Sequence, residues 1–327
     1  MNSYTSLMEH LAPDLAEVEL QLAAATSHAE PLVDDATTHL AKAGGKRLRP
    51  LLTLLASQLG GGANDDVRRA AVAVEVTHLA SLYHDDVMDS ATLRRGAPAA
   101  QALWGNNVAI LTGDLLFARA SQLVASLGPQ AVLIHAPPVE RLCLGPLPEA
   151  LGPQPGEDAV AHYLGVLADK TGSLIATSAR YGALFAGADA EEVAVMEAFG
   201  EKVGVAFQLA DDVIDLSADS ATSGKTPGTD LKEGVDTMPV LLLRQRQRSG
   251  TIDEPGAAIL ARLATEMDDA TLADVVAELR DHPVVDEARD MARRWSDDAV
   301  AELAALPPGE VRLALEDFAV LLVDRLH

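Results

Sequence analysis

Two clusters of aspartates, each at the end of an apolar stretch, are the residues of this sequence best suited to chemistry. Residues 74–89 read VEVTHLASLYHDDVMD, and residues 205–216 read VAFQLADDVIDL. In each DDxxD pattern the first and last aspartates are four residues apart and therefore share one face of a helix. If the two helix ends face each other, each pair of carboxylates about 4 Å apart would cost roughly 4 kcal/mol at an effective dielectric constant near 20, a cost that divalent cations would remove. The aspartates concerned are Asp85, Asp86, Asp89, Asp211, Asp212 and Asp215.

The ligand chemistry of these clusters favours magnesium. Their donor atoms are all oxygens, and the single cysteine, Cys143, excludes a multi-cysteine zinc site. Mg²⁺ in proteins keeps several waters and is usually completed by the phosphates of a substrate, so the clusters predict a phosphorylated substrate. One DDxxD pattern alone would be better interpreted as a charged helix end in solvent; its repetition argues against that interpretation.

Local groups of basic residues offer a second site for an anion. Residues 44–50 read GGKRLRP and place Lys46, Arg47 and Arg49 directly after a glycine turn, and Arg94 and Arg95 follow the first acidic cluster. Glycines allow close approach of the backbone, and the forked guanidinium of arginine matches phosphate. The alternative, a solvated basic loop that balances nearby acids, stays open for either group alone.

The composition limits the partners of the chain. Its 327 residues include 25 Lys and Arg against 49 Asp and Glu, a formal net charge of −24. Such a chain is a poor partner for nucleic acid or for an anionic membrane surface. A lone cysteine excludes an internal disulfide and fits a reducing compartment. Because neither a signal peptide nor an apolar run of about 18 residues is visible, we expect a cytoplasmic protein without a membrane span.

The elements that would position these residues are helices. Alanine and leucine dominate, and apolar residues recur with helical spacing in residues 11–28, 67–89, 108–127, 159–185 and 191–216. Asn64 is the predicted N-cap of the helix expected over residues 67–89. The simplest interpretation is a single all-α domain over residues 1–327, whose core is covered by the amphipathic segment from about Thr251 onward.

A proline-rich stretch, residues 136–156, interrupts this pattern. Proline is tolerated at the first position of a helix but breaks hydrogen bonds in its interior. We therefore expect a helix to start near Pro138, to kink or end near Gly145, and to give way to a loop.

Taken together, the motifs resemble the trans-polyprenyl (isoprenyl) diphosphate synthases over most of the chain. The matching pieces follow the family order: GGKRLRP at 44–50, HDDVMD at 84–89, RRG at 94–96, GDLLFARA at 113–120, KTGSLIATS at 170–178, FQLADDVIDL at 207–216 and GKTPGTDLKEG at 224–234. The resemblance implies helices around a central cavity, usually in a homodimer. It also implies head-to-tail condensation of isopentenyl diphosphate with an allylic diphosphate, assisted by about three Mg²⁺ ions per active site.

The resemblance also assigns roles to single residues. Asp85 and Asp89 would hold two Mg²⁺ ions, and Asp211, with Asp215 acting through water, would hold a third. Asp86 and Asp212 would be supporting acids. The residues implied to bind isopentenyl diphosphate are Lys46, Arg49, His78 and Arg95. Those implied to bind the allylic diphosphate are Arg94, Lys170 and Lys225. Thr171 and Gln208 would lie beside the reacting carbon, where Lys170 also acts.

Helix geometry bears on the length of the product. In the resembled family, bulky residues one or two turns before the first acidic cluster block the growing chain. Here that part of the helix carries Val74, Thr77, Ala80 and Ser81, none of them aromatic. Small residues at Ala80 and Ser81 would let a chain pass beyond Val74, about 16 Å along the helix from Asp85. We expect a product longer than farnesyl diphosphate, a long-chain prenyl tail, with geranylgeranyl as the alternative.

Some positions depart from the family pattern, and two other functions stay open. The sequence has Gly145-Pro146 where a Gly-Gln step is common, a Pro137-Pro138 pair, and Val235 where a lysine is common. A class I terpene cyclase would share the fold and one DDxxD cluster but would need no site for isopentenyl diphosphate. A non-catalytic helical subunit that regulates a catalytic partner is the second alternative.

Overall fold

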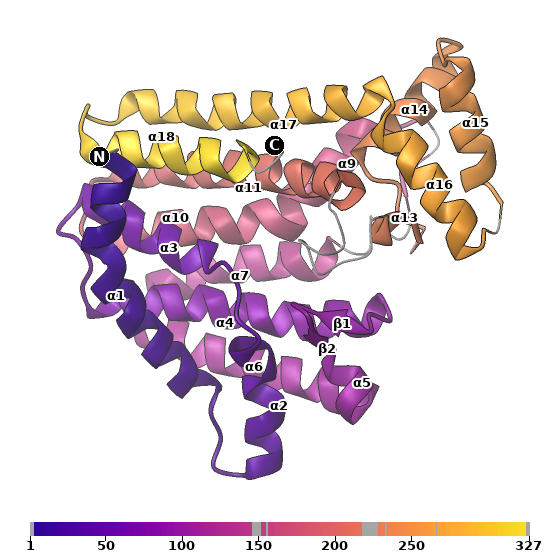
Figure 1. Cartoon of the computed structure of the whole chain (residues 1–327). Coiled ribbons are helices and arrows are strands. Elements are labelled where there is room, and N and C mark those ends of the chain that lie inside the picture. Colours follow the sequence, from indigo (N-terminus) through magenta and orange to yellow (C-terminus); the bar gives the residue numbers. More distant parts are fainter. Residues whose placement is uncertain are drawn as a thin grey trace.

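Helices make up nearly all of this computed structural model, as predicted for an all-α chain (Figure 1). The structure describes residues 3–145, 152–154, 156–217, 228–232, 234–265 and 267–324. The α-helices are α1 (Ser3–Thr26), α2 (Pro31–Lys42), α3 (Leu48–Ala56), α4 (Asp65–Met88), α5 (Ala100–Trp104), α6 (Asn106–Ser126), α7 (Pro129–Leu144), α9 (Ala159–Leu167), α10 (Ser173–Phe185), α11 (Ala190–Ser217), α13 (Thr229–Lys232), α14 (Met238–Ser249), α15 (Glu254–Leu263), α16 (Asp269–Arg280), α17 (Pro283–Glu302) and α18 (Glu310–Val323). An antiparallel hairpin, β1 (Leu93–Arg94) and β2 (Ala97–Pro98), pairs Leu93 with Pro98 and Arg94 with Ala97.

The long helix α11 connects the two largest hydrophobic clusters. Phe199 and Val203 pack into a cluster built mainly from α1, α3, α4, α6, α10 and α18. Further along, Leu209 and Val213 pack with α9 and α14 to α17. The C-terminal segment covers the core as expected, since Phe318 of α18 belongs to the first cluster.

The arrangement of the helices brings the two acidic clusters to one end of the molecule. In Figure 1, α4, α10 and α11 run side by side, with α17 and α18 on one face of the bundle and α2 and α6 on the other. Both α4 and α11 end on the side where the hairpin and α13 to α16 lie. The aspartates at the ends of both helices therefore share this side of the fold.

Asn64 caps α4 as predicted. Its side-chain oxygen accepts hydrogen bonds from the backbone nitrogens of Asp66 and Val67, both at 2.9 Å. Two of the otherwise unpaired N–H groups at the helix start are satisfied in this way. The cap fixes where α4 begins, and the acidic cluster follows at its other end.

The expected helix start near Pro138 is wrong. α7 begins at Pro129, directly after Gly128, and runs through Pro137 and Pro138 to Leu144. Proline at the first position costs no hydrogen bond, so the Gly128-Pro129 step is the better start signal. The expected end near Gly145 is confirmed, while Pro146 lies outside the described residues.

One helix in the described part of the chain, α6, is long and apolar enough to cross a membrane by length and composition alone. Its most apolar window has a mean hydropathy of 1.4 and is one-third buried. α6 packs along α4, where it contributes Ala109, Leu116 and Ala120 to the largest core cluster. This packing makes α6 a helix of the bundle, with part of its apolar surface exposed.

Close contact between α3 and α10 depends on Gly182, and we expect Gly182→Ala to destabilise the fold. A methyl group there would overlap the Thr53 carbonyl and lie 2.9 Å from the Cβ of Ala56. Such overpacking should lower the free energy of unfolding by about 1–3 kcal/mol, measurable by thermal unfolding. Gly165→Ala is the matched control, because open space surrounds that helical glycine and alanine should stabilise it by roughly 0.5–1 kcal/mol. Equal melting temperatures for the two variants would contradict this prediction.

Candidate active site

The first acidic cluster lies at the C-terminal end of α4, where three carboxylates meet the negative end of the helix dipole. Burial raises the pKa of Asp85 to about 6, Lys170 opposes this rise, and Asp89 adds to it. Asp86 is fully buried and forms an ion pair with Arg94, whose Nη2 lies 2.5 Å from its Oδ1. Acids at this end of a helix are unfavourable without cations, so the cluster is suited to binding positive charge.

A π-helical turn over Ala168–Gly172 carries Lys170 and Thr171 into the site. Such turns are uncommon and often occur at functional sites, because the extra residue changes the direction of the side chains. Lys170 lies close enough to Asp85 to lower the pKa of that carboxyl. The Thr171 hydroxyl donates to Oε1 of Gln208 on α11 at 3.1 Å. The turn therefore connects the first acidic cluster with the helix that bears the second.

Ion pairs and close packing hold the π-helical turn against its neighbours. Arg141 of α7 binds Asp169 and Glu201, each at 2.6 Å. A Cβ at Gly204 would lie 2.6 Å from the Cα of Gly172, so the turn and α11 touch through two glycines. Sequence reasoning missed these supports, because each joins residues from different helices.

In the second cluster, at the end of α11, the adjacent aspartates have different surroundings. Asp212 is buried and accepts hydrogen bonds from the Tyr163 hydroxyl at 2.9 Å and from the backbone nitrogen of Met238 at 3.3 Å. Asp211 and Asp215 are half-buried. Asp212 and Asp86 are thus both buried and bound to partners within the protein.

The predicted magnesium ligands fit the usual requirements of Mg²⁺. Each i, i+4 pair offers two carboxylates, and no group of three or more His, Cys, Asp or Glu side chains within the described residues could hold a metal ion alone. Mg²⁺ is typically bound by one or two carboxylates together with water and substrate phosphates. The donor set fits an ion that is completed by a phosphorylated ligand.

Most of the predicted basic residues gather around His78. Burial lowers the pKa of His78 well below its usual value, and Arg49 and then Arg95 lower it further, so the imidazole is neutral near pH 7. Burial also lowers the pKa of Arg49 to about 10. The Lys46 ammonium lies 5.7 Å from the centre of the Phe207 ring on α11. A bound anion with several negative charges would stabilise this group of closely spaced cations. The predicted Lys225 lies outside the described residues.

The predicted product-length residues lie on α4 and are all buried. Thr77 and His135 of α7 share a hydrogen bond of 3.1 Å, and the imidazole stacks on Tyr181 of α10 with 6.2 Å between ring centres. Tyr181 also packs in one cluster with Val74. An aromatic side chain thus lies beside this row although the row itself has none, a feature that no local pattern in the sequence could reveal.

The chain is similar to known proteins over nearly its whole length. The family model described as polyprenyl synthetase matches residues 30–271. The chain is 44% identical to nonaprenyl diphosphate synthase of Mycobacterium tuberculosis over 94% of this chain and 91% of that protein. It is 36% identical to heptaprenyl diphosphate synthase component 2 of Geobacillus stearothermophilus over 98% of each. A crystal structure of polyprenyl synthase from Caulobacter crescentus, complexed with calcium and isoprenyl diphosphate, superposes with a TM-score of 0.90 at 33% identity, covering 100% of this chain and 99% of that one.

Proposed function

The chain belongs to the polyprenyl synthetase family, a family of prenyltransferases, and on this basis we propose that it condenses isopentenyl diphosphate head-to-tail with an allylic diphosphate. The product would be an all-trans polyprenyl diphosphate longer than farnesyl, as the names of several relatives suggest for those proteins. The observation that carries the proposal is the position of the π-helical turn, which reaches both acidic helices. Lys170 is close enough to Asp85 to lower the pKa of that carboxyl, and the adjacent Thr171 donates to Gln208 on the helix that ends in the second cluster.

The proposed reaction begins with loss of diphosphate from the allylic substrate. Asp85, Asp89, Asp211 and Asp215 would hold about three Mg²⁺ ions, which when bound stabilise the negative charge of the departing diphosphate. Lys170 and Arg94, together with Lys225, would bind the allylic diphosphate. Arg49, Arg95, Lys46 and the neutral His78 would hold isopentenyl diphosphate in the second anion site.

Weak dipoles of the protein would stabilise the resulting allylic cation. The Thr171 hydroxyl and the Gln208 amide, joined at 3.1 Å, place partial charges near the reacting carbon and offer no strong nucleophile. Apolar helix walls would keep water away from the cation. The released diphosphate can accept the proton that is lost after the new bond forms, so no side chain is required as the general base.

The decisive experiment incubates the purified chain with Mg²⁺, isopentenyl diphosphate and a series of allylic primers, and sizes the products. Growth of the primer by five-carbon units would support the proposal. Cyclised or hydrolysed products formed equally without isopentenyl diphosphate would instead identify a class I terpene cyclase. Product that appears only after a second protein is added would identify a subunit of a two-component enzyme, a possibility raised by the relative named component 2.

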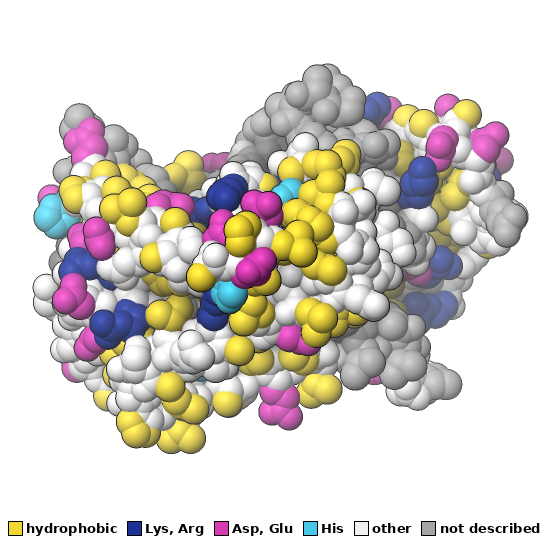
Figure 2. Space-filling view, turned by 90° about the horizontal axis from the view of Figure 1, so that it is seen from below, with side chains coloured by type: hydrophobic (Ala, Val, Ile, Leu, Met, Phe, Trp, Pro, Cys, Tyr) yellow, Lys and Arg dark blue, Asp and Glu magenta, His cyan; other side chains and the backbone are white. Residues whose placement is uncertain are grey.

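We also propose a homodimer in the cytoplasm, a single domain of residues 1–327 in each copy. Apolar side chains gather on the face seen from below in Figure 2, the side on which α6 lies in Figure 1. On α6 and α7, Leu111 is 66% exposed and Leu133 is 75% exposed. Apolar surface of this kind favours association with a second copy. Sedimentation of the wild type and of Leu111→Glu would test the dimer, since a charge in the interface should shift the chain to a monomer.

Chain length should respond to Ala80. Because Ala80 is fully buried one turn before the acidic cluster, a tyrosine there should occupy space needed by the product. We expect Ala80→Tyr to move the main product toward geranylgeranyl or farnesyl diphosphate, as sized by chromatography of the dephosphorylated alcohols. Ala80→Ser is the small-residue control, and His135→Ala, which removes the ring between Thr77 and Tyr181, should have the opposite effect. An unchanged product from Ala80→Tyr would refute the tunnel along α4.

A further inference from the structure

The basic motif GGKRLRP contains one cation that differs from its neighbours. Arg47 lies between Lys46 and Arg49 and immediately precedes α3, with a left-handed backbone of φ 49°. Residues other than glycine seldom adopt this conformation, and they do so where other contacts hold them there. The side chain of Arg47 is only 10% exposed and provides those contacts.

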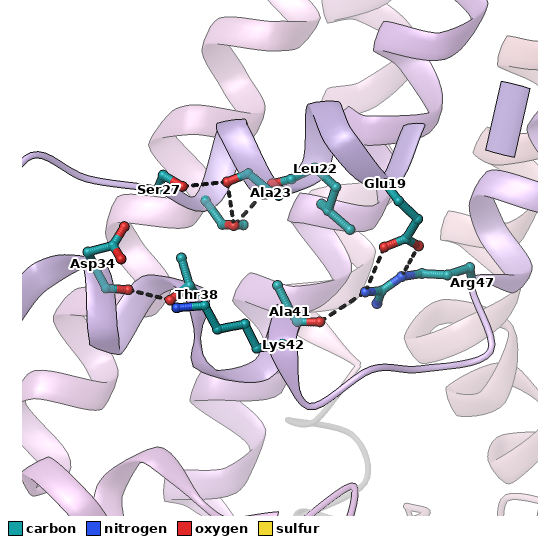
Figure 3. A pocket seen from close by; sticks show the side chains of 10 residues that line it. Glu19, Leu22, Ala23, Ser27, Asp34, Thr38, Ala41, Lys42 and Arg47 are labelled. Atoms are coloured by element: carbon teal, nitrogen blue, oxygen red, sulfur yellow. Dashed lines mark hydrogen bonds and ion pairs between the residues drawn. The ribbon is translucent and has the colours of Figure 1, made fainter. Parts of the chain in front are cut away.

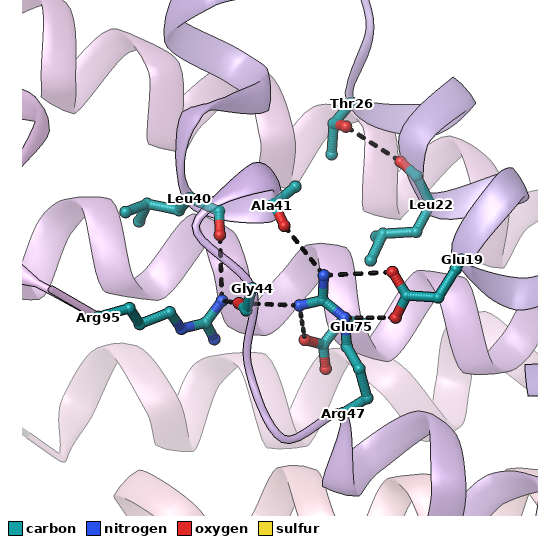
Figure 4. A network of polar contacts seen from close by, with 9 residues as sticks. All are labelled: Glu19, Leu22, Thr26, Leu40, Ala41, Gly44, Arg47, Glu75 and Arg95. Atoms are coloured by element: carbon teal, nitrogen blue, oxygen red, sulfur yellow. Dashed lines mark hydrogen bonds and ion pairs between the residues drawn. The ribbon is translucent and has the colours of Figure 1, made fainter. Parts of the chain in front are cut away.

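Every N–H of the Arg47 guanidinium is used inside the protein (Figure 4). Nε and Nη2 donate to the two carboxylate oxygens of Glu19 at 2.6 and 3.3 Å, and Nη2 also donates to the Ala41 carbonyl at 3.0 Å. Nη1 donates to Glu75 at 3.1 Å and to the Gly44 carbonyl at 3.3 Å. A guanidinium has five N–H donors, so Arg47 has none left for a phosphate.

The neighbouring cations are different in this respect. Nε of Arg49 is buried and has no hydrogen-bond partner within the described structure. Arg95 donates through Nη1 to the carbonyls of Leu40 and Gly44, so that Arg47 and Arg95 meet at one carbonyl oxygen. The loop that carries Lys46 and Arg49 is therefore fixed at Gly44 by two arginines.

The two acids that hold Arg47 come from different helices and have different exposure. Glu75 of α4 is 2% exposed, and its charge also attracts Arg49 and Arg95. Glu19 of α1 faces a cavity of about 270 Å³ between α1 and α2 (Figure 3), and its side chain is 43% exposed. Arg47 thus ties the anion-binding loop to α1, α2 and α4 at once.

We propose that Arg47, clamped by Glu19 and Glu75, is a positioning residue that sets the affinity of the loop for isopentenyl diphosphate without touching it. This inference rests on the function proposed above. The clamp neutralises Arg47 and aligns Lys46 and Arg49, which leaves the positive charge of Arg49 and Arg95 for the ligand. Binding of the allylic diphosphate, which would be held near Lys170 and Arg94, should not depend on the clamp.

Replacing Glu19 distinguishes a positioning role of Arg47 from direct binding of the diphosphate by Arg47, because the two roles predict opposite changes in the affinity for isopentenyl diphosphate. If Arg47 bound the diphosphate itself, Glu19→Ala would remove a competing carboxylate and tighten binding. The clamp predicts the reverse: Glu19→Ala and Arg47→Lys should raise the KM for isopentenyl diphosphate about tenfold, with the KM for the allylic primer and kcat within about twofold. Glu19→Gln, whose amide oxygen can still accept from Nε, should recover part of the loss.

Glu17→Ala is the matched control, because it removes an equal charge from an exposed position on the same helix. Calorimetric titration with isopentenyl diphosphate alone measures affinity without turnover, so an inactive wild type that binds this ligand would contradict the proposed function and still test the clamp. Tighter or unchanged binding by Glu19→Ala would overturn the inference, and so would equal losses for both substrates. A wild type that does not bind isopentenyl diphosphate would overturn both proposals.

Discussion

Asp85→Ala is expected to lower kcat/KM by about 10³-fold or more, because it removes a carboxylate that would hold a charge-stabilising cation. The side chain of Asp85 accepts no hydrogen bond within the described structure, and burial next to Asp89 raises its pKa to about 6. A carboxyl whose charged form is destabilised by burial contributes little to the stability of the fold. The melting temperature should therefore stay close to that of the wild type.

A binding measurement separates loss of the cation from other causes. Mg²⁺ together with inorganic diphosphate should raise the melting temperature of the wild type, since a ligand that binds only the native state stabilises it. The same addition should have little effect on Asp85→Ala. Asp297→Ala, at an exposed position on α17, is the control and should behave as the wild type. Wild-type turnover by Asp85→Ala would refute the assignment of Asp85 as a magnesium ligand.

Asp86 illustrates what the sequence could not distinguish. Adjacent aspartates in DDxxD are chemically identical in the sequence, and only the i, i+4 rule separated Asp85 and Asp89 from Asp86. In the structure Asp86 is fully buried and bound to Arg94, eight residues further along the chain. The sequence predicted the helix end and the pairing face, because both are local. The partner of the remaining acid depended on how the hairpin folds back, which is not local.

The π-helical turn at Lys170 and the prolines of α7 show two features of helices that local sequence patterns do not predict. Apolar spacing predicted one helical segment over residues 159–185, but it did not distinguish the π-helical turn at 168–172 from a continuous α-helix. In α7 a local rule placed the helix start at Pro138, but tertiary contacts keep the helix intact around the prolines. These contacts include the ion pairs of Arg141 and the burial of Ile134. Tertiary packing commonly outweighs such local preferences.

The sequence around Glu75 carries a signal for a buried ion pair. It is the only charged residue between Arg69 and Asp85. A charge in so apolar a helix must be paired if it is buried, and such pairing requires a cation from elsewhere in the chain. The sequence could predict that a partner exists. It could not select Arg47 from the several basic residues, because that choice depends on the turn at Gly44.

The second acidic cluster gives a contrast between neighbouring residues. Asp211→Ala should lower kcat/KM by about 10²-fold or more while leaving the fold intact, since it removes one ligand of the third proposed cation. Asp212→Ala should act mainly on stability. Its carboxylate accepts from the Tyr163 hydroxyl and from the backbone nitrogen of Met238, the first residue of α14. Losing an acceptor for buried donors costs about 1–3 kcal/mol for each group, so the melting temperature should fall by several degrees.

Thermal unfolding and steady-state kinetics on both variants would test this division of roles. Asp212→Asn keeps a side-chain oxygen that can accept from Tyr163, so it should recover much of the lost stability, whereas Asp211→Asn should recover little of the lost activity. That difference arises because a hydrogen bond needs an acceptor of suitable geometry, while a divalent cation needs the negative charge as well. If Asp212→Ala lost activity at an unchanged melting temperature, Asp212 would be a ligand of the cation and not a support of α14.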